Sequence, residues 1–377
     1  MKFNTKCVHG GGQPDSTGAI SPAIYMSSTF THPGLGETTG FQYTRESNPT
    51  RDRLETLIAG LEEGTDAIAF SSGMAAVDAV FHLFSPGDHV ILGDDLYGGS
   101  IRLFTNIYEK NGVEFTYVGT SDLDAVQAAF KPNTKAVYIE TPTNPMMEIT
   151  DVRALSKMAH DHNALVIIDN TFLSPYFQKP LTLGADIVVH SGTKFIGGHH
   201  DVISGFTIVK DDDLAAQLRL IYKTVGACLS AFDSWLVIRG IKTLALRMEQ
   251  HQKNAIALAE WLKQEPKVTK VLFPGIPEHP GYEVNKSQTT GFGGMLSFEV
   301  DSEETAKQVL EGIQLIQFAE SLGGTESLLT YPVTQTHPDL KPEDAERKGI
   351  TRRLLRLSVG IEDTDDLIAD LAQAFHK

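Results

Sequence analysis

The feature that most constrains the fold is the alternation of short apolar runs with helical segments between residues 51 and 245. The runs are brief and rich in Val and Ile, and longer stretches with helical periodicity separate most of them. We expect strands at 67–70, 89–92, 114–118, 136–140, 165–169, 186–189 and 206–209, and helices at 74–84, 100–111, 123–130 and 152–162. This alternation predicts βαβ units and an α/β fold with a mostly parallel sheet.

The two ends of the chain follow other patterns. Residues 1–50 are rich in Gly, Pro, Ser and Thr and show no sustained period, so we expect an irregular arm that packs on something else, such as another subunit. Asn48 and Pro49 at its end have the pattern of a helix start. Beyond a helical stretch at 214–262, we expect strands at 268–273, 294–300 and 354–358, and helices at 303–311 and 364–374. The predicted division is an arm at 1–50, a large α/β domain at 51–245 and a smaller α+β domain at 246–377.

Composition limits the classes of partner. The net charge of −16 disfavours broad binding to nucleic acid or to anionic membranes. No apolar run approaches the roughly 20 residues that span a bilayer, and Met1–Lys6 lacks the apolar core of a signal peptide. The two cysteines, Cys7 and Cys228, fit a reducing compartment. We therefore expect a soluble cytoplasmic protein.

A lysine lies directly beyond one of the predicted strands. The strand at 186–189 leads into Ser191-Gly192-Thr193-Lys194. Ligands of open α/β sheets bind beyond the carboxyl ends of the strands, so Lys194 is expected to point into a site. A lysine flanked by hydroxyl groups that can bind phosphate suits a Schiff-base lysine that holds pyridoxal 5'-phosphate (PLP). The alternative is a surface loop lysine.

A second segment fits the phosphate of such a cofactor. Ser71-Ser72-Gly73-Met74 follows a strand and opens a helix, where unpaired backbone N–H groups and the helix dipole favour an anion. Gly73 would let the phosphate approach the backbone closely. The alternative is ordinary helix capping by Ser71 or Ser72.

Asp169 ends a buried strand, where an unpaired carboxylate is costly. The protonated ring nitrogen of PLP would supply its partner. A helix cap or a strand-end turn is the alternative for any single aspartate.

Further candidates occupy strand ends or an apolar strand. Tyr97 follows the strand at 89–92 and could stack on the cofactor and move a proton. Asn144 follows the strand at 136–140 and could bind the phenolic oxygen of the cofactor, although an Asn-Pro turn explains it equally. Arg356 lies inside an apolar strand and suits an α-carboxylate; its alternative is a structural salt bridge.

Histidines near Lys194 raise the question of a metal. His190, His199 and His200 lie close to it in sequence, but no carboxylate stands at helical spacing with them. Capping and core hydrogen bonds explain them better, and we expect no metal. A metal hydrolase that uses Asp169, His190 and His199 is a weak alternative.

Taken in order, these motifs resemble the Cys/Met-metabolism family of PLP-dependent enzymes, over essentially the whole chain. The motifs are Tyr43-x-Arg45-x-x-Asn48-Pro49-Thr50-Arg51, Ser72-Gly73-Met74-Ala75-Ala76, Asp95-Leu96-Tyr97-Gly98, Glu140-Thr141-Pro142-x-Asn144-Pro145, Asp169-Asn170-Thr171, Ser191-x-Thr193-Lys194, Glu320-Ser321-Leu322-Gly323-Gly324 and Arg356-Leu357-Ser358-Val359-Gly360. The resemblance implies PLP-dependent transferase fold type I, which is aspartate-aminotransferase-like.

The resemblance also implies a role for each candidate. The cofactor-binding residues would be Lys194 (Schiff base), Asp169 (ring nitrogen), Gly73, Met74, Ser191 and Thr193 (phosphate), Tyr97 (stacking) and Thr171. Tyr43 and Arg45 would reach the phosphate of a neighbouring subunit, which implies a homotetramer built from dimers that share active sites. Asn144 and Arg356 would bind the substrate carboxylate region, and Ser321 would place Lys194 or the substrate. Lys194 would be the catalytic base and Tyr97 the candidate acid.

Glu320 carries the expectation for the reaction. An acidic residue before Ser321 is similar to the γ-lyases and γ-synthases of this family, where it can hold the distal amino group of cystathionine. Gln42 departs from that pattern, because those enzymes often carry a second acid there. We expect α,γ-elimination of L-cystathionine to cysteine, 2-oxobutanoate and ammonia, with some β-elimination of cystathionine or cystine. The alternatives are a β-lyase, a γ-synthase that joins cysteine to an O-acylhomoserine, and an inactive binding or regulatory protein.

Overall fold

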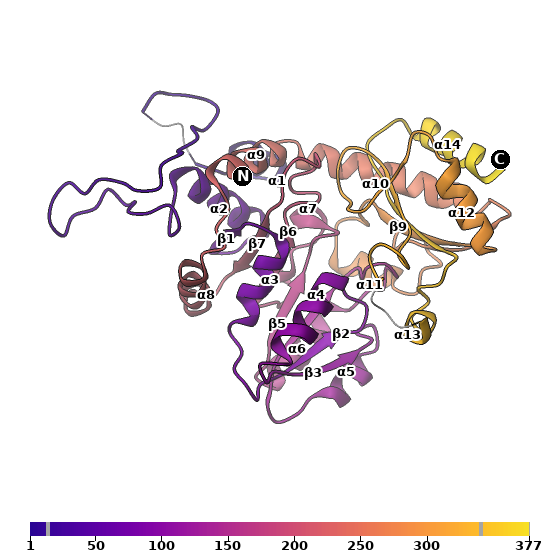
Figure 1. Ribbon diagram of the computed structural model, residues 1–377, viewed down its shortest axis with the longest axis horizontal. Coiled ribbons are helices and arrows are strands. Elements are labelled where there is room, and N and C mark those ends of the chain that lie inside the picture. The colour runs from indigo at the N-terminus through magenta and orange to yellow at the C-terminus, as the bar shows by residue number, and fades with distance from the viewer. Residues whose placement is uncertain (13–15, 339–341, 377) are drawn as a thin grey trace.

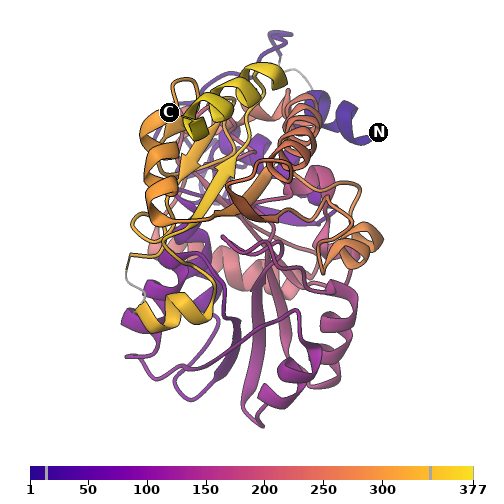
Figure 2. The ribbon, with the colours of Figure 1, turned by 90° about the vertical axis from the view of Figure 1, so that its right-hand side faces the viewer.

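Two β-sheets organise the chain, and one long helix extends from the first to the second (Figure 1). The structure is a computed structural model that describes residues 1–12, 16–338 and 342–376. Figure 2 shows the C-terminal part, in orange and yellow, stacked on the large sheet in magenta and purple. No helix in these ranges is long and apolar enough to cross a membrane.

The first sheet has the strand order β1-β7-β6-β5-β4-β2-β3. Its strands are β1 (Asp66–Phe70), β2 (His89–Gly93), β3 (Glu114–Val118), β4 (Thr134–Glu140), β5 (Leu165–Asp169), β6 (Ile187–Ser191) and β7 (Gly205–Val209). Strands β2 to β6 pair in parallel, whereas β7 runs antiparallel to both β1 and β6. The mostly parallel sheet predicted from the alternating pattern is confirmed.

Helices cover both faces of this sheet because its central strands are apolar on both sides. Val90 and Leu92 of β2 pack into one core with Phe81, while Ile91 between them packs into another with Leu155. The helices and turns of this part are α2 (Pro49–Glu62), α3 (Gly73–Phe81), α4 (Gly98–Leu103), the π-helical turn η1 (Phe104–Tyr108), α5 (Leu123–Ala129), α6 (Val152–Asp161), α7 (Ser174–Phe177), the 3-10 turn η2 (Pro180–Thr182), α8 (Asp212–Val225) and α9 (Ala231–Ile241).

The second sheet has the order β10-β11-β12-β9-β8. Its strands are β8 (Val268–Leu272), β9 (Met295–Val300), β10 (Gln317–Phe318), β11 (Leu328–Thr330) and β12 (Leu354–Ser358), and its helices are α11 (Tyr282–Gln288), α12 (Glu303–Gly312), α13 (Pro342–Arg347) and α14 (Thr364–His376). All neighbours pair antiparallel except β10 and β11, which are parallel. The sequence did not predict these two strands, because each is too short to show a period.

Helix α10 (Leu244–Leu262) connects the two sheets. Its first turns bury Leu244 and Met248 in the core that contains Phe206 of the large sheet. Its last turns bury Leu258 and Leu262 in the core of the small sheet. One helix therefore belongs to both cores.

The N-terminal segment differs in part from the irregular arm that was expected. Phe3–His9 form helix α1, which buries Cys7 and sets Phe3 edge-on against Tyr176. Because α1 is short and buries only Cys7, its sequence shows no helical period of apolar residues. Residues 16–48, indigo in Figure 1, extend from the body of the molecule. The predicted start of α2 is confirmed, because the Asn48 side chain accepts a hydrogen bond from the Thr50 N–H at 3.0 Å and Pro49 is the first helical residue.

Candidate active site

A cavity of about 340 Å³ lies at the carboxyl ends of the parallel strands, where the two sheets meet. This is the edge at which open α/β sheets bind ligands. Most of the predicted site residues line it, namely Gly73, Met74, Tyr97, Asn144, Asp169, Thr171, Ser191, Thr193, Lys194, Glu320, Ser321 and Arg356. Residues that are far apart in the sequence therefore meet in one hollow.

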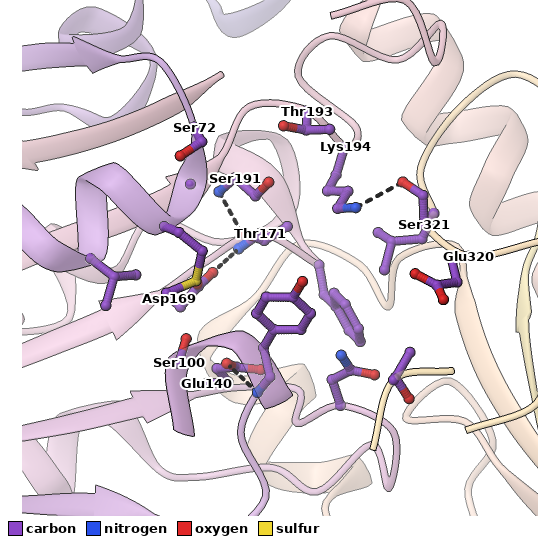
Figure 3. Close-up of a pocket in the computed structure, with 18 of the residues that line it drawn as sticks. Ser72, Ser100, Glu140, Asp169, Thr171, Ser191, Thr193, Lys194, Glu320 and Ser321 are labelled. Atoms are coloured by element: carbon purple, nitrogen blue, oxygen red, sulfur yellow. Dashed lines mark hydrogen bonds between the residues drawn. The ribbon is translucent and has the colours of Figure 1, made fainter. Parts of the chain in front are cut away.

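Lys194 follows β6 and points across the cavity toward the small-sheet part (Figure 3). Its Nζ donates a hydrogen bond to Ser321 Oγ at 2.7 Å. Burial and, to a lesser extent, the positive charge of Arg356 lower the pKa of Lys194 to about 8, while the negative charge of Glu320 opposes the fall. A larger share of the amine is consequently neutral near physiological pH than for a lysine in water.

Ser321 is fixed by the arginine behind it. Its φ of 85° lies in the left-handed region, which a non-glycine residue seldom occupies. Arg356 donates from Nη2 to the Ser321 carbonyl oxygen at 3.0 Å. Backbone in this region persists when the surroundings hold it, and such positions gather at functional sites.

Asp169 and the residues after it form a chain of hydrogen bonds. The Thr171 N–H donates to Asp169 Oδ1 at 3.0 Å, and the Ser191 N–H donates to Thr171 Oγ1 at 2.8 Å (Figure 3). Burial raises the pKa of Asp169, while the hydrogen bonds from Thr171 oppose that rise. A cation beside the carboxylate would stabilise its charged form.

The start of α3 faces the end of β6. Ser72 caps the helix by accepting a hydrogen bond from the Ala75 N–H at 3.0 Å. Gly73 and Met74 lie in the first turn of the helix, where backbone N–H groups have no acceptor within the helix. A Cβ on Gly73 would lie 2.9 Å from Ser191 Cβ, so only glycine allows this close approach. The arrangement suits an anion.

Thr193 is less free to bind that anion. Its hydroxyl donates to the Ser204 carbonyl at 3.2 Å and accepts from the Ser204 N–H at 3.1 Å. A phosphate contact would require the hydroxyl hydrogen to turn away from Ser204.

Arg356 is buried on β12 and faces neutral partners. It donates from Nη1 to Asn144 Oδ1 at 2.8 Å and from Nη2 to Thr330 Oγ1 at 3.1 Å. Its Nε has no hydrogen-bond partner among the described residues. Burial lowers the pKa of Arg356 to about 10. An incoming carboxylate would supply the missing partner and charge, which favours the ligand-binding interpretation over a structural salt bridge.

The remaining predicted site residues, Tyr43 and Arg45, do not line the cavity. Arg45 lies over the Tyr43 ring at 5.5 Å, and its guanidinium donates to the Lys223 carbonyl. His190, by contrast, has the predicted core role, because its Nε2 pairs with Glu62 Oε1 at 2.5 Å and both side chains are inaccessible to solvent. The described residues contain no group of His, Cys, Asp or Glu placed to hold a metal ion.

The model of one protein family, described as Cys/Met metabolism PLP-dependent enzyme, matches residues 4–376. The chain belongs to this family. A cystathionine β-lyase of Lactococcus lactis subsp. cremoris is 48% identical over 100% of this chain and 99% of its own length. A cystathionine γ-synthase of Haemophilus influenzae is 50% identical over 99% and 97%. The crystal structure of a cystathionine γ-lyase from Lactobacillus plantarum complexed with L-serine superposes with a TM-score of 0.98 at 47% identity, over 100% and 99%.

Family membership establishes fold type I and PLP as the cofactor. The cavity fits this group from end to end. Gly73 and Met74 offer N–H groups for a phosphate, Asp169 offers a carboxylate for a cationic ring nitrogen, and Lys194 offers an amine for the aldehyde. Burial raises the pKa of Asp169, so a cationic ring nitrogen beside it would favour the charged carboxylate.

Sequence reasoning missed several residues that line the cavity. They are Val77, Ser100, Arg102, Glu140, Pro142, Phe172, Ile203, Leu322, Gln335 and Thr336. Glu140 could have been found, because it ends an apolar strand in the same way as Asp169. Gln335 and Thr336 come from a loop without a recognisable motif, so the sequence did not identify them as site residues.

Proposed function

We propose that this enzyme cleaves the C–S bond of L-cystathionine by α,γ-elimination, giving cysteine, 2-oxobutanoate and ammonia. β-Elimination of cystathionine or cystine would be a secondary activity. The proposal is supported by the family, by the cofactor that the family uses and by relatives whose names include cystathionine lyases.

Two groups would orient the amino acid. Arg356 can fork onto the α-carboxylate with its Nε, which has no partner among the described residues, and Asn144 steers the guanidinium through the bond to its Nη1. The substrate amine then lies beside Lys194 Nζ. Holding the Cα–H bond toward that nitrogen supplies much of the rate enhancement.

Lys194 and Tyr97 would move the protons. PLP supplies an electron sink that stabilises the charge left when the substrate loses its Cα proton. Lys194 Nζ, with its lowered pKa, would take that proton, return it to the bound substrate–cofactor pair and, neutral again, take the second proton from Cβ, as γ-elimination requires. Ser321 Oγ, 2.7 Å from Nζ, keeps the amine directed into the cavity between these transfers. The Tyr97 hydroxyl is the acid for the leaving sulfur.

Glu320 is the observation that favours γ-elimination. It lines the cavity next to Ser321 and points toward its interior (Figure 3). A carboxylate in the same cavity as Lys194 can pair with the distal ammonium of cystathionine. An acidic residue directly before Ser321 is the feature that this chain shares with the γ-lyases and γ-synthases of the family, and for that reason it favours the γ-reaction.

Product analysis with purified protein, PLP and L-cystathionine tests the proposal. Cysteine with 2-oxobutanoate would support it. Homocysteine with pyruvate would assign the β-lyase reaction, named for the relative from Lactococcus lactis. Formation of cystathionine from cysteine and an O-acylhomoserine would assign the γ-synthase reaction, named for the relative from Haemophilus influenzae.

Absorbance separates an active enzyme from an inactive binding protein of the same fold. The purified protein should show a visible band from bound PLP, and Lys194→Ala should abolish both the band and turnover. Lys157→Ala, at an exposed position on α6, should change neither.

A further inference from the structure

Two acidic residues stand side by side at the end of the cavity away from Ser321. Glu140 and Asp169 are register partners at the carboxyl ends of the neighbouring strands β4 and β5. Both line the cavity, and Figure 3 shows them on the side opposite Ser321 and Glu320. Asp169 faces the ring nitrogen in the proposed arrangement, whereas that arrangement leaves Glu140 without a task.

Glu140 makes a specific contact with the segment that carries Tyr97. Its Oε1 accepts a hydrogen bond from the Tyr97 N–H at 2.8 Å. Tyr97 immediately precedes α4 and has no side-chain cap, so this carboxyl group takes the place of one. The bond is partly buried, and a backbone N–H that loses its partner there is destabilising. The contact therefore ties the tyrosine backbone to the end of β4.

We propose that Glu140 is a positioning residue, which holds Tyr97 in place over the cofactor and does so as a neutral group, so that Asp169 alone carries negative charge beside the ring. The inference rests on the proposed placement of Tyr97 and of the cofactor. It does not depend on which C–S bond is cleaved.

The surroundings of Glu140 explain why it is the neutral partner. Burial, together with the negative charges of Asp169 and Asp95, raises the pKa of Glu140 well above its usual range, and only the Tyr97 N–H opposes the rise. Asp169 has hydrogen bonds from Thr171 that stabilise its charge. Two adjacent buried carboxyl groups do not both ionise, and the one with more hydrogen bonds to its charged form keeps the charge.

The other titratable neighbours agree with this assignment. Tyr138 lies two residues before Glu140 on β4, and burial with the charge of Asp169 raises its pKa, so it stays neutral. Burial raises the pKa of Asp95 to about 6. Neither residue brings a positive charge that would ionise Glu140.

Titration of apoprotein with PLP, followed by absorbance from pH 6 to pH 9, tests the inference. Glu140→Gln keeps a neutral acceptor for the Tyr97 N–H, so its Kd should stay within about threefold of wild type with an unchanged pH profile. Glu140→Ala removes the acceptor and should raise the Kd about tenfold. Glu114→Gln, at an exposed position on β3 in the same sheet, is the matched control and should match wild type.

Three results would overturn the inference. Equal losses for Glu140→Gln and Glu140→Ala would mean that the charge of Glu140 matters. Wild-type affinity for Glu140→Ala would mean that it positions nothing. A changed pH profile for Glu140→Gln would mean that Glu140 titrates in this range. Asp169→Asn should weaken PLP binding in every case, and if it does not, the proposed arrangement of the cofactor is wrong rather than the role of Glu140 alone. Thermal unfolding of each apoprotein identifies variants that fail to fold.

Discussion

At the scale of single residues, Lys194 occupies a place that disfavours its own positive charge. It is buried beside Arg356, and its pKa is lowered from 10.5 to about 8. The same environment that makes it a usable base therefore makes the apoprotein less stable. Functional sites commonly carry such a cost.

This cost predicts a pH-dependent gain in stability for Lys194→Met. Below pH 8 the lysine is protonated in both the folded and the unfolded chain, and the folded chain bears the full penalty. Between pH 8 and pH 10.5 only the unfolded chain binds the proton, so wild-type stability rises with pH. At about 1.4 kcal/mol per pKa unit, Lys194→Met should stabilise the apoprotein by about 3 kcal/mol at pH 7, and the gain should vanish near pH 10.5.

Urea unfolding of the apoproteins at pH 7 and pH 10 measures the effect. Lys157→Met, on the exposed face of α6, should show no pH-dependent gain. A gain for Lys194→Met that is the same at both pH values would contradict the electrostatic explanation.

Glu320 gives a second prediction at this scale. Glu320→Gln keeps the shape of the side chain but removes the charge proposed to bind the distal ammonium. We expect kcat/KM for cystathionine to fall about tenfold or more, chiefly through KM. A γ-thioether amino acid without the distal amino group should be affected far less. Steady-state kinetics with both substrates decides, and equal losses would remove the distal contact from the proposal.

At the scale of elements, the close approach of α3 to the end of β6 is set by Gly73. Gly73→Ala would place a methyl group 2.9 Å from Ser191 Cβ and push the helix away from the strand. Because the phosphate site lies between them, we expect PLP affinity to fall about tenfold or more. Absorbance titration of the apoprotein measures it.

Gly60 in α2 provides the matched control. A Cβ there meets nothing within 4 Å. Gly60→Ala should leave PLP affinity unchanged and stabilise the protein by about 0.5–1 kcal/mol, as expected for glycine in a helix interior. If Gly73→Ala behaves like Gly60→Ala, the spacing between α3 and β6 does not matter for the cofactor.

Elements with a clear period were predictable and the others were not. The strand at 165–169 and the helix start at Pro49 follow from local residue preferences and match the structure. Strand β11 forms because it pairs with the edge of β12, and β10 forms because it pairs with β11, which are tertiary causes. Helix α1 likewise depends on packing against the rest of the chain rather than on its own sequence.

The site residues that could be predicted are charged residues within or directly after apolar strands, because a charge in such a place has few possible roles. Lys194, Asp169 and Arg356 each stand in a place that needs a partner, and all three line the cavity. The bond from Lys194 to Ser321 and the place of the Arg356 side chain beside Asn144 could not be predicted, because they depend on how the two sheets meet. Glu140 was overlooked although it meets the same criterion as Asp169.

At the scale of the whole molecule, the N-terminal segment suggests a second copy of the chain. Ile20, Met26 and Leu35 are apolar and largely exposed, and Tyr43 and Arg45 lie away from the cavity. The resemblance assigns these last two residues to the phosphate site of a neighbour. Shared sites, the homotetramer and the domain boundary near residue 245 stay predictions.

Mixed oligomers test the shared site. Arg45→Ala and Lys194→Ala should each inactivate the enzyme. If each site combines Lys194 of one subunit with Arg45 of its neighbour, unfolding and refolding an equal mixture should restore roughly a quarter of wild-type activity, because half of the dimers are mixed and each has one intact site. Refolding each variant alone is the control. No recovery in the mixture would mean that the two residues serve the same subunit.

Helix α10 has a consequence for how the molecule comes apart. Its first turns belong to the core of one sheet and its last turns to the core of the other. If the core around either sheet opens, apolar side chains of α10 become exposed, although the same helix still packs in the other core. Local opening in one half should propagate to the next, so that the backbone amides in the middle of α10 exchange with solvent hydrogen only through global unfolding, among the slowest in the chain.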